Sequence, residues 1–156
     1  FYSRIETQLQ PKGSTLKINN HMPKISLQGS LDALVSVLTN LAENALQACE
    51  ENCTIELDVY QQADFVILAM KDNGPGLTQE QQLHIFEPFY SERDSGTGLG
   101  LAVAQSIAQA HQGDLMVKSE ADKGCTFYLC LPLNQGEQFL PSGRSNIAGQ
   151  HDGETK

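Results

Sequence analysis

The sequence has few basic residues and no long hydrophobic run. Ten Lys and Arg stand against nineteen Asp and Glu, giving a formal net charge of -9, and no basic stripe with interleaved aromatics appears. This balance argues against nucleic acid as a partner. No apolar run approaches the roughly 20 residues that span a bilayer, and residues 1–10 lack a signal-peptide layout. We therefore expect a soluble, cytoplasmic domain without membrane contact.

The sequence also lacks the Cys-x-x-Cys spacing that is common in zinc sites. Its four cysteines stand at positions 49, 53, 125 and 130. Because disulfides are rare in cytosolic proteins, we expect all four to be reduced, mostly buried thiols.

The 156 residues, 40% of them hydrophobic, are enough for one globular domain with a real core. The chain begins with Phe1 and not with Met, so we expect a domain excised from a longer protein. The predicted parts are a linker or helix over residues 1–12, a folded domain over 13–134 and a flexible, polar tail over 135–156.

Hydrophobic periodicity predicts helices and strands in mixed order. Alternating runs at 14–19 and 23–27 predict a strand pair, and further strands are expected at 54–61, 65–72, 114–120 and 125–133. A long helix should follow Ser30 as N-cap and reach about Cys49, a short one should follow Thr78, and a second long one should cover 99–112. The order predicts an α+β fold: a two-layer sandwich whose mixed, mostly antiparallel sheet is covered on one face by helices.

Two asparagines, Asn40 and Asn44, stand one turn apart inside the first long helix, although asparagine is a mediocre helix former. On the helical wheel they share a face with Glu43 and Gln47, opposite the apolar residues. The simplest interpretation is a solvated face. The functional alternative is a site for a hydrated cation, because Mg²⁺ takes oxygen ligands and usually keeps several waters.

Two glycine-rich stretches follow. The first, DNGPGL at 72–77, comes directly after an apolar strand and places the Asp72 carboxylate at its end, where burial requires hydrogen bonds. Alone, it predicts only a turn. The second, GTGLGL at 96–101, opens a helix whose backbone N–H groups and positive end suit a phosphate chain. It is not the dinucleotide fingerprint, and it lacks the Lys of a P-loop.

Together and in this order, NLAENA, DNGPGL, FEPFY, GTGLGL and GCTF resemble the N, G1, F, G2 and G3 motifs of the catalytic, ATP-binding domain of sensor histidine kinases. That domain has the Bergerat fold of the wider superfamily of gyrase, histidine kinase and MutL ATPases. The resemblance covers about residues 13 to 133. The short lid between Tyr90 and Gly96 resembles the nitrogen-regulatory subgroup of sensor kinases, and the flanking segments faintly resemble flagellar-regulatory sensor kinases.

The resemblance implies ATP and Mg²⁺ as cofactors and a role for each matching residue. Asn44 would supply an oxygen to Mg²⁺, Asn40 would face the phosphates, and Asp72 would accept a hydrogen bond from the adenine amino group. Arg93 stands where the subgroup has a lysine and could bridge the β- and γ-phosphates, which makes it the third catalytic candidate beside the two asparagines. The remaining candidates for nucleotide binding are Gly74, Gly76, Phe89, Gly96, Thr97, Gly98, Leu99, Gly100 and Cys125.

Two positions depart from the family pattern. Cys125 replaces the hydroxyl that helps to hold water at the adenine, and the neighbouring Thr126 should point to the other face of its strand. Asn40 replaces the glutamate that serves as general base in hydrolytic members, and an amide cannot usefully accept a proton near pH 7. The pattern therefore favours phosphoryl transfer to a histidine over hydrolysis, with Glu43 left open as a surrogate base.

The acceptor histidine is absent from this sequence. None of His21, His84, His111 and His151 has the family's acceptor context of a following Glu or Asp and a Pro a few residues on. The expected partners are thus an upstream dimerisation and phosphoacceptor domain of the same protein, to which residues 1–12 would lead, and a response regulator. Two alternatives stay open: an anti-sigma-factor serine kinase, which typically has glutamate at the Asn40 position, and a nucleotide-sensing module that transfers no phosphate, for which Cys125 leaves room.

Overall fold

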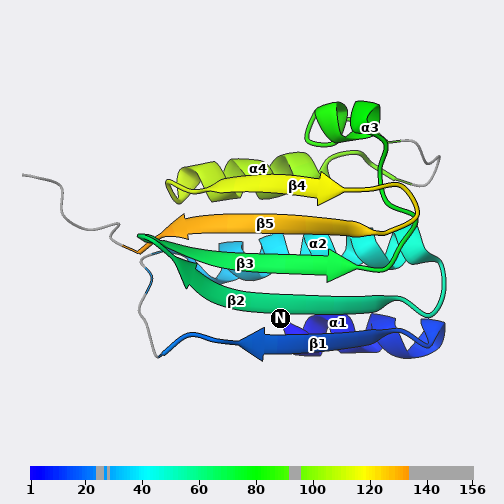
Figure 1. The fold of residues 1–156 in the computed structure, drawn as a ribbon, viewed down its shortest axis with the longest axis horizontal. Coiled ribbons are helices and arrows are strands. Elements are labelled where there is room, and N and C mark those ends of the chain that lie inside the picture. The colour runs from blue at the N-terminus through cyan, green and yellow to red at the C-terminus, as the bar shows by residue number, and fades with distance from the viewer. Residues whose placement is uncertain (24–26, 28, 92–95, 134–156) are drawn as a thin grey trace, which may run out of the picture.

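The computed structural model describes residues 1–23, 27, 29–91 and 96–133. These residues form a five-stranded sheet in the order β1-β2-β3-β5-β4 (Figure 1). β1 pairs with β2 in parallel, and the other neighbours are antiparallel. The strands are β1 (Thr15–Asn20), β2 (Thr54–Gln62), β3 (Phe65–Asp72), β4 (Asp114–Ser119) and β5 (Cys125–Pro132).

Helices cover one face of this sheet, so the predicted two-layer α+β architecture is confirmed (Figure 1). The helices of the described residues are α1 (Tyr2–Leu9), the 3-10 helix η1 (Gln10–Lys12), α2 (Leu31–Cys49), α3 (Gln79–His84) and α4 (Gly100–Ala110). α3 is short and lies beside the β4 edge. Within the described part of the chain, each helix is too short or too polar to cross a membrane.

Local sequence explains where the helices begin. The Ser30 side chain accepts a hydrogen bond from the Ala33 N–H and caps α2, as predicted. Thr78 and Gln81 form a reciprocal capping box at the start of α3. The buried side chains of α2 recur every three or four residues, as a helix facing a sheet requires: Val37, Leu38, Leu41, Ala42, Ala45 and Leu46.

The core lies between the helices and the inward face of the sheet. β5 alternates strictly, burying Phe127, Leu129 and Leu131 beneath the helices. α1 contributes Ile5 and Leu9 to the same core. Burying a large aliphatic side chain is worth about 1.5–3 kcal/mol, so α1 contributes to the stability of this fold. The boundary expected after residue 12 stays a prediction.

The expected pairing of the runs 14–19 and 23–27 is not found among the described residues. β1 instead pairs with β2, with Thr15 opposite Thr54. Residues 24–26 lie outside the described residues, and residues 21–23 and 27 form no strand. A parallel pair needs a crossover connection, and α2 provides it between β1 and β2.

The expectation of four reduced thiols is wrong for two of them. Cys49 and Cys53 form a disulfide, whereas Cys125 and Cys130 are free thiols as predicted. Between the paired cysteines, Glu50 and Asn52 have positive φ angles of 62° and 53°. This tight turn brings the two Cα atoms to 5.4 Å, inside the range that a disulfide spans. A sequence search restricted to zinc spacing could not reveal the pair.

Candidate functional site

Asp72 is the last residue of β3 and lies on the helix-covered face of the sheet, where the residue is only 4% exposed. The backbone N–H groups of Gly74 and Cys125 donate to its Oδ1 at 2.9 and 3.2 Å. Burial raises the pKa of this carboxyl above its ordinary value of 3.8, and the two N–H groups act in the opposite direction. Two backbone N–H groups therefore bind this buried carboxylate. Such hydrogen bonds were expected from the sequence, because burial of an unpaired carboxylate is costly.

The turn after Asp72 packs tightly against its neighbours. A Cβ on Gly74 would lie 3.0 Å from Asp72 Oδ1 and 3.3 Å from Cys49 Sγ. Gly76 has a φ of +73°, and any side chain there would collide with the carbonyl oxygen of Glu120. Asp72, Gly74, Gly76 and Cys125, predicted separately from two motifs, thus gather at one end of the sheet.

Ser119, at the end of β4, joins the same cluster, and sequence reasoning missed it. Its Oγ accepts from the Leu77 N–H at 2.7 Å, donates to the Gly124 carbonyl at 2.8 Å and lies 3.2 Å from Cys125 Sγ. A serine hydroxyl therefore stands beside the thiol that replaces the family's hydroxyl. The signal was available, because Ser119 is the register partner of Cys125 in the β4–β5 hairpin.

Gln82 was also missed, and it fastens α3 to this region. Its side chain donates to the Ser119 carbonyl at 3.1 Å and accepts from the Ser119 N–H at 3.2 Å. An amide that pairs with both backbone groups of an edge residue fixes the helix against the strand. α3 therefore holds a defined place beside β4, close to the end of the Asp72 turn.

Asn40 and Asn44 are half-buried on α2, one turn apart. Asn40 Nδ2 donates to the carbonyl of Gly100 at 3.3 Å, which brings the asparagine face of α2 to the first residue of α4. Among the described residues, no side chain caps the start of α4, and the first N–H groups of a helix suit an anion. The structure thus brings together the predicted Asn40 and Gly100 from motifs 60 residues apart.

The start of the expected lid is fixed by a contact between Phe89 and Gly98. The Phe89 N–H donates to the Gly98 carbonyl at 2.9 Å. Gly98 has a φ of +67°, and a Cβ there would lie 2.6 Å from the Phe89 carbonyl carbon. Of the nearby candidates, Gly96, Thr97 and Leu99 are exposed, and Thr97 Oγ1 accepts from the Leu99 N–H at 3.4 Å. Arg93 lies outside the described residues.

Glu43, the open candidate for a surrogate base, is engaged by α1. The Gln8 side chain donates to Glu43 Oε1 at 3.0 Å. This contact directs the carboxylate toward the N-terminal helix, whereas Asn40 on the same helix reaches α4. The two polar residues that the helical wheel grouped together therefore have different neighbours.

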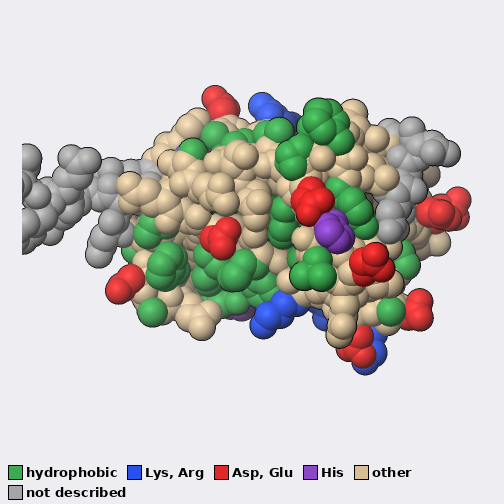
Figure 2. Space-filling model, turned by 90° about the horizontal axis from the view of Figure 1, so that it is seen from above, with side chains coloured by type: hydrophobic (Ala, Val, Ile, Leu, Met, Phe, Trp, Pro, Cys, Tyr) green, Lys and Arg blue, Asp and Glu red, His purple; other side chains and the backbone are tan. Residues whose placement is uncertain are grey.

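A separate apolar groove of about 380 Å³ runs along α4, and its lining includes Pro88, Leu99, Val103 and Ile107. Asp72 does not line it, so this groove is not the cluster at the end of β3. Figure 2 looks down on the edge of the molecule that carries β4, α3 and α4. Hydrophobic side chains form several separate patches there, with acidic side chains between them.

Comparison of the sequence with known proteins gives a family match. A family model described as "Histidine kinase-, DNA gyrase B-, and HSP90-like ATPase" matches residues 29–135. The chain is 40% identical over 126 residues to the signal transduction histidine-protein kinase AtoS of Escherichia coli (strain K12), covering 80% of this chain and 20% of that protein. It is 36% identical over 107 residues to sporulation kinase E of Bacillus subtilis (strain 168), covering 67% and 14%. The chain thus spans a fifth or less of these relatives.

Comparison with solved structures shows that this fold is shared with histidine kinase structures. The catalytic domain of the histidine kinase ThkA superposes with a TM-score of 0.76 at 24% identity, covering 85% of this chain and 87% of that one. The ThkA kinase in complex with the response regulator TrrA superposes with a TM-score of 0.72 at 22% identity, covering 85% and 38%. At these identities the superpositions show the shared fold.

Proposed function

Because the chain belongs to the family of histidine kinase-, DNA gyrase B- and HSP90-like ATPases, as a catalytic ATP-binding domain of the sensor kinase type, we propose that it binds Mg·ATP between α2, the turn after β3 and the start of α4. The γ-phosphoryl group then passes to a histidine on a separate dimerisation and phosphoacceptor domain, and from there to a response regulator. The complex of ThkA with its regulator supports the last step by analogy of fold.

The observation that carries this proposal is the buried carboxylate of Asp72. Both of its described hydrogen bonds end on Oδ1 and come from the backbone. Oδ2 is then free to accept from a ligand, and the exocyclic amino group of adenine is a neutral donor of the right kind. A buried acceptor of this kind gives specificity, because a base without the matching donor leaves the carboxylate unpaired.

The phosphate end of the proposed site lies where α2 meets α4. The N-terminus of α4, which no described side chain caps, offers N–H groups and a positive helix end to the triphosphate. Asn44 supplies an amide oxygen suited to a hard cation, and Asn40 holds the start of α4 beside it. Mg²⁺, when bound with ATP, would neutralise charge on the phosphates.

The residues Asn40 and Glu43 favour transfer of the γ-phosphoryl group over hydrolysis of ATP. The Asn40 amide already donates to Gly100 and cannot accept a proton from water near neutral pH. The Glu43 carboxylate accepts from Gln8 on α1. The relatives are named as kinases, which agrees with this interpretation, and the alternative of an anti-sigma-factor serine kinase has no support from them.

Calorimetry with ATP, with and without Mg²⁺, tests the proposal on the purified chain. We expect binding to be stronger with Mg²⁺, and Asn44→Ala to remove that gain, because the substitution deletes the amide oxygen. Gln109→Ala, which removes an exposed amide from α4, is the matched control and should bind as the unmodified chain does. Equal affinity of the unmodified chain with and without Mg²⁺ would show that the asparagine face is only a solvated face.

A further inference from the structure

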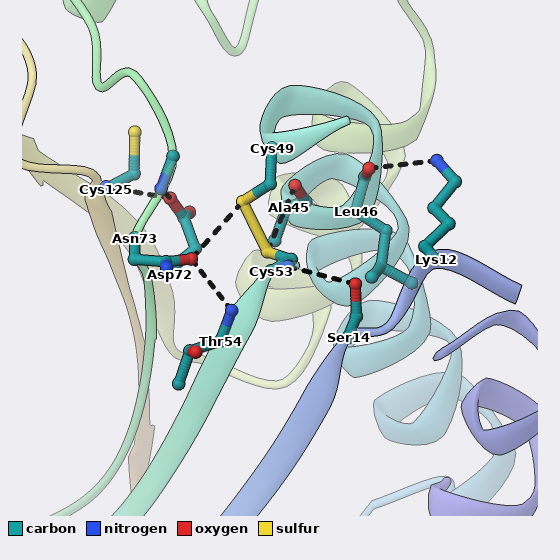
Figure 3. The surroundings of a disulfide bond; sticks show 11 residues. Lys12, Ser14, Ala45, Leu46, Cys49, Cys53, Thr54, Asp72, Asn73 and Cys125 are labelled. Carbon is teal, nitrogen blue, oxygen red and sulfur yellow. Dashed lines mark hydrogen bonds between the residues drawn. A yellow bond between two sulfur atoms is a disulfide. The ribbon is translucent and has the colours of Figure 1, made fainter. Parts of the chain in front are cut away.

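The disulfide between Cys49 and Cys53 lies against the proposed nucleotide site (Figure 3). Cys49 is the last residue of α2, the helix that carries both asparagines, and Cys53 comes directly before β2. On the other side, Cys49 Sγ lies 3.7 Å from Asn73 Oδ1 in the turn that follows Asp72. The bridge therefore touches both the helix and the turn between which we place ATP.

Each sulfur of the pair also has an oxygen acceptor within reach. Cys53 Sγ lies 3.6 Å from the Ala45 carbonyl oxygen, and Cys49 Sγ lies 3.7 Å from Asn73 Oδ1. Neither sulfur carries a hydrogen while the disulfide exists, so these are contacts and not hydrogen bonds in that state. After reduction each thiol could donate to its neighbouring oxygen. The surroundings thus accommodate both the disulfide and the dithiol.

Reduction of Cys49 can affect Asp72 through its neighbours Asn73 and Gly74 in the turn. Asn73 Oδ1 accepts from the Thr54 N–H at 2.8 Å and so ties the turn to the start of β2. A Cys49 thiol that donates to the same oxygen would share this acceptor with the Thr54 N–H and weaken that bond. Gly74, whose N–H donates to Asp72 Oδ1 at 2.9 Å, follows directly, and a Cβ on it would lie 3.3 Å from Cys49 Sγ.

We propose that Cys49 and Cys53 are a reversible redox modification site that adjusts the nucleotide pocket in response to low-molecular-weight disulfides. Cys49 is half-buried and reacts first, whereas Cys53 is only 1% exposed. The Cys49 thiolate attacks the small disulfide RSSR, forming a mixed disulfide and releasing one thiol RSH after protonation. Cys53 then attacks Cys49 Sγ and releases the second RSH. Two protein thiols are oxidised, and RSSR is reduced to two RSH.

The disulfide state holds the turn in the arrangement described above, and reduction introduces the competing thiol. Since one hydrogen bond is at stake, we expect the affinity for ATP to fall about three- to tenfold on reduction. The size of this effect rests on the proposed ATP binding, whereas formation of the bridge does not.

The test treats the purified chain with mixtures of oxidised and reduced glutathione. Mass spectrometry of the peptides should show Cys49 joined to Cys53 and two hydrogens lighter in the oxidised samples, and calorimetry should give the weaker ATP affinity in the reduced ones. Cys49→Ala should abolish this redox dependence. Cys130→Ser, which removes a free thiol on β5, should preserve it.

Failure of each part is distinguishable. If the bridge forms at no ratio of the two glutathiones, the modification site is refuted. If the bridge forms and ATP binds equally to both states, the coupling to the pocket is refuted. If the bridge forms and neither state binds ATP, the proposed function fails together with the coupling.

Discussion

At the scale of a single residue, substitution of Asp72 distinguishes a nucleotide-binding site from a simple turn. If its carboxylate accepts from the adenine amino group, Asp72→Ala removes a charge-assisted hydrogen bond. Such bonds are worth about 1.5–3 kcal/mol, so ATP affinity should fall roughly 10- to 150-fold. Guanine presents a carbonyl where adenine presents an amine, so GTP should bind the unmodified chain far more weakly than ATP. Calorimetry with both nucleotides measures the two effects.

The control for this prediction is the melting temperature without ligand. Asp72 is buried and receives two backbone donors, so its removal leaves those donors to be satisfied by water or not at all. We expect the fold to survive, because burial already makes the ionised carboxylate costly. Equal ATP affinity in both proteins, or a melting temperature so low that unfolding explains the loss, would make Asp72 structural.

The raised pKa of Asp72 also predicts a pH dependence. Because its folded-state pKa lies above the ordinary value of 3.8, the folded state takes up the proton first as the pH falls. The stability that Asp72 contributes is fully present below the pKa that its carboxyl has in the unfolded state. It is lost as the pH rises through the pKa of the folded state. Asp72→Asn, which does not titrate, should flatten this part of the stability curve. Denaturant unfolding at a series of pH values, from about one unit below the pKa of an ordinary aspartate to several units above it, measures this effect.

As the pH falls, the stability contributed by Asp72 increases, whereas the affinity of the unmodified chain for ATP should decrease. Protonation removes the charge that strengthens the bond from the adenine amine, so affinity should fall on the acid side, beginning above pH 3.8. The same acid loss of affinity in Asp72→Asn would assign the titration to another group.

At the scale of elements, the contact of Phe89 with Gly98 fixes the entry into α4. Gly98→Ala forces a side chain into the left-handed region, which costs roughly 1–2 kcal/mol, and sets a methyl group 2.6 Å from the Phe89 carbonyl carbon. We expect a lower free energy of unfolding and weaker ATP binding, both measurable in denaturant and nucleotide titrations.

Gly100→Ala supplies the matched control for this backbone effect. A Cβ at Gly100 would meet only Asn40 atoms at 3.9 Å, an ordinary contact, and alanine is the better helix former. Its stability should equal or exceed that of the unmodified chain. If Gly98→Ala unfolds at the same denaturant concentration as Gly100→Ala, the Phe89 contact does not constrain the loop.

Elements with strong local signals could be predicted from the sequence. The cap at Ser30, the three-to-four spacing through Leu41 and Ala45, and the alternation of β5 all act within a few residues, and the structure agrees with each. The β1 partner was predicted wrongly because pairing depends on the α2 crossover, which no local pattern encodes. The Cys49–Cys53 bridge depends likewise on the turn conformation at Glu50 and Asn52.

Those residues of the candidate site that belong to sequence motifs could be predicted. Asp72, Gly74 and Cys125 were named from the sequence, and the structure places them together. Ser119 and Gln82 were not named, because the role of Ser119 follows from the register of the β4–β5 hairpin and that of Gln82 from the docking of α3 on β4. Polar residues that act through tertiary contacts carry no periodic signal of their own.

At the scale of the whole molecule, the proposed reaction needs a second domain, because no histidine of this chain has the acceptor context. We expect the chain alone to acquire no acid-labile phosphate from ATP, but to phosphorylate a supplied dimerisation domain in trans. Arg93→Ala should slow this transfer more than it weakens ATP binding, if its guanidinium stabilises charge that develops on the γ-phosphoryl group. Radiolabelled ATP and calorimetry separate the two effects.

Lys17→Ala is the control for the loss of one positive charge. Lys17 forms an exposed ion pair with Glu56 on the β1–β2 edge of the sheet, away from the proposed phosphate site. An exposed ion pair contributes little to stability, and this one lies away from the proposed site, so the transfer rate should not change. If both variants slow transfer equally, the effect is one of net charge and Arg93 has no special role. Acid-labile label on the isolated chain would place an acceptor within these 156 residues and refute the division into two domains.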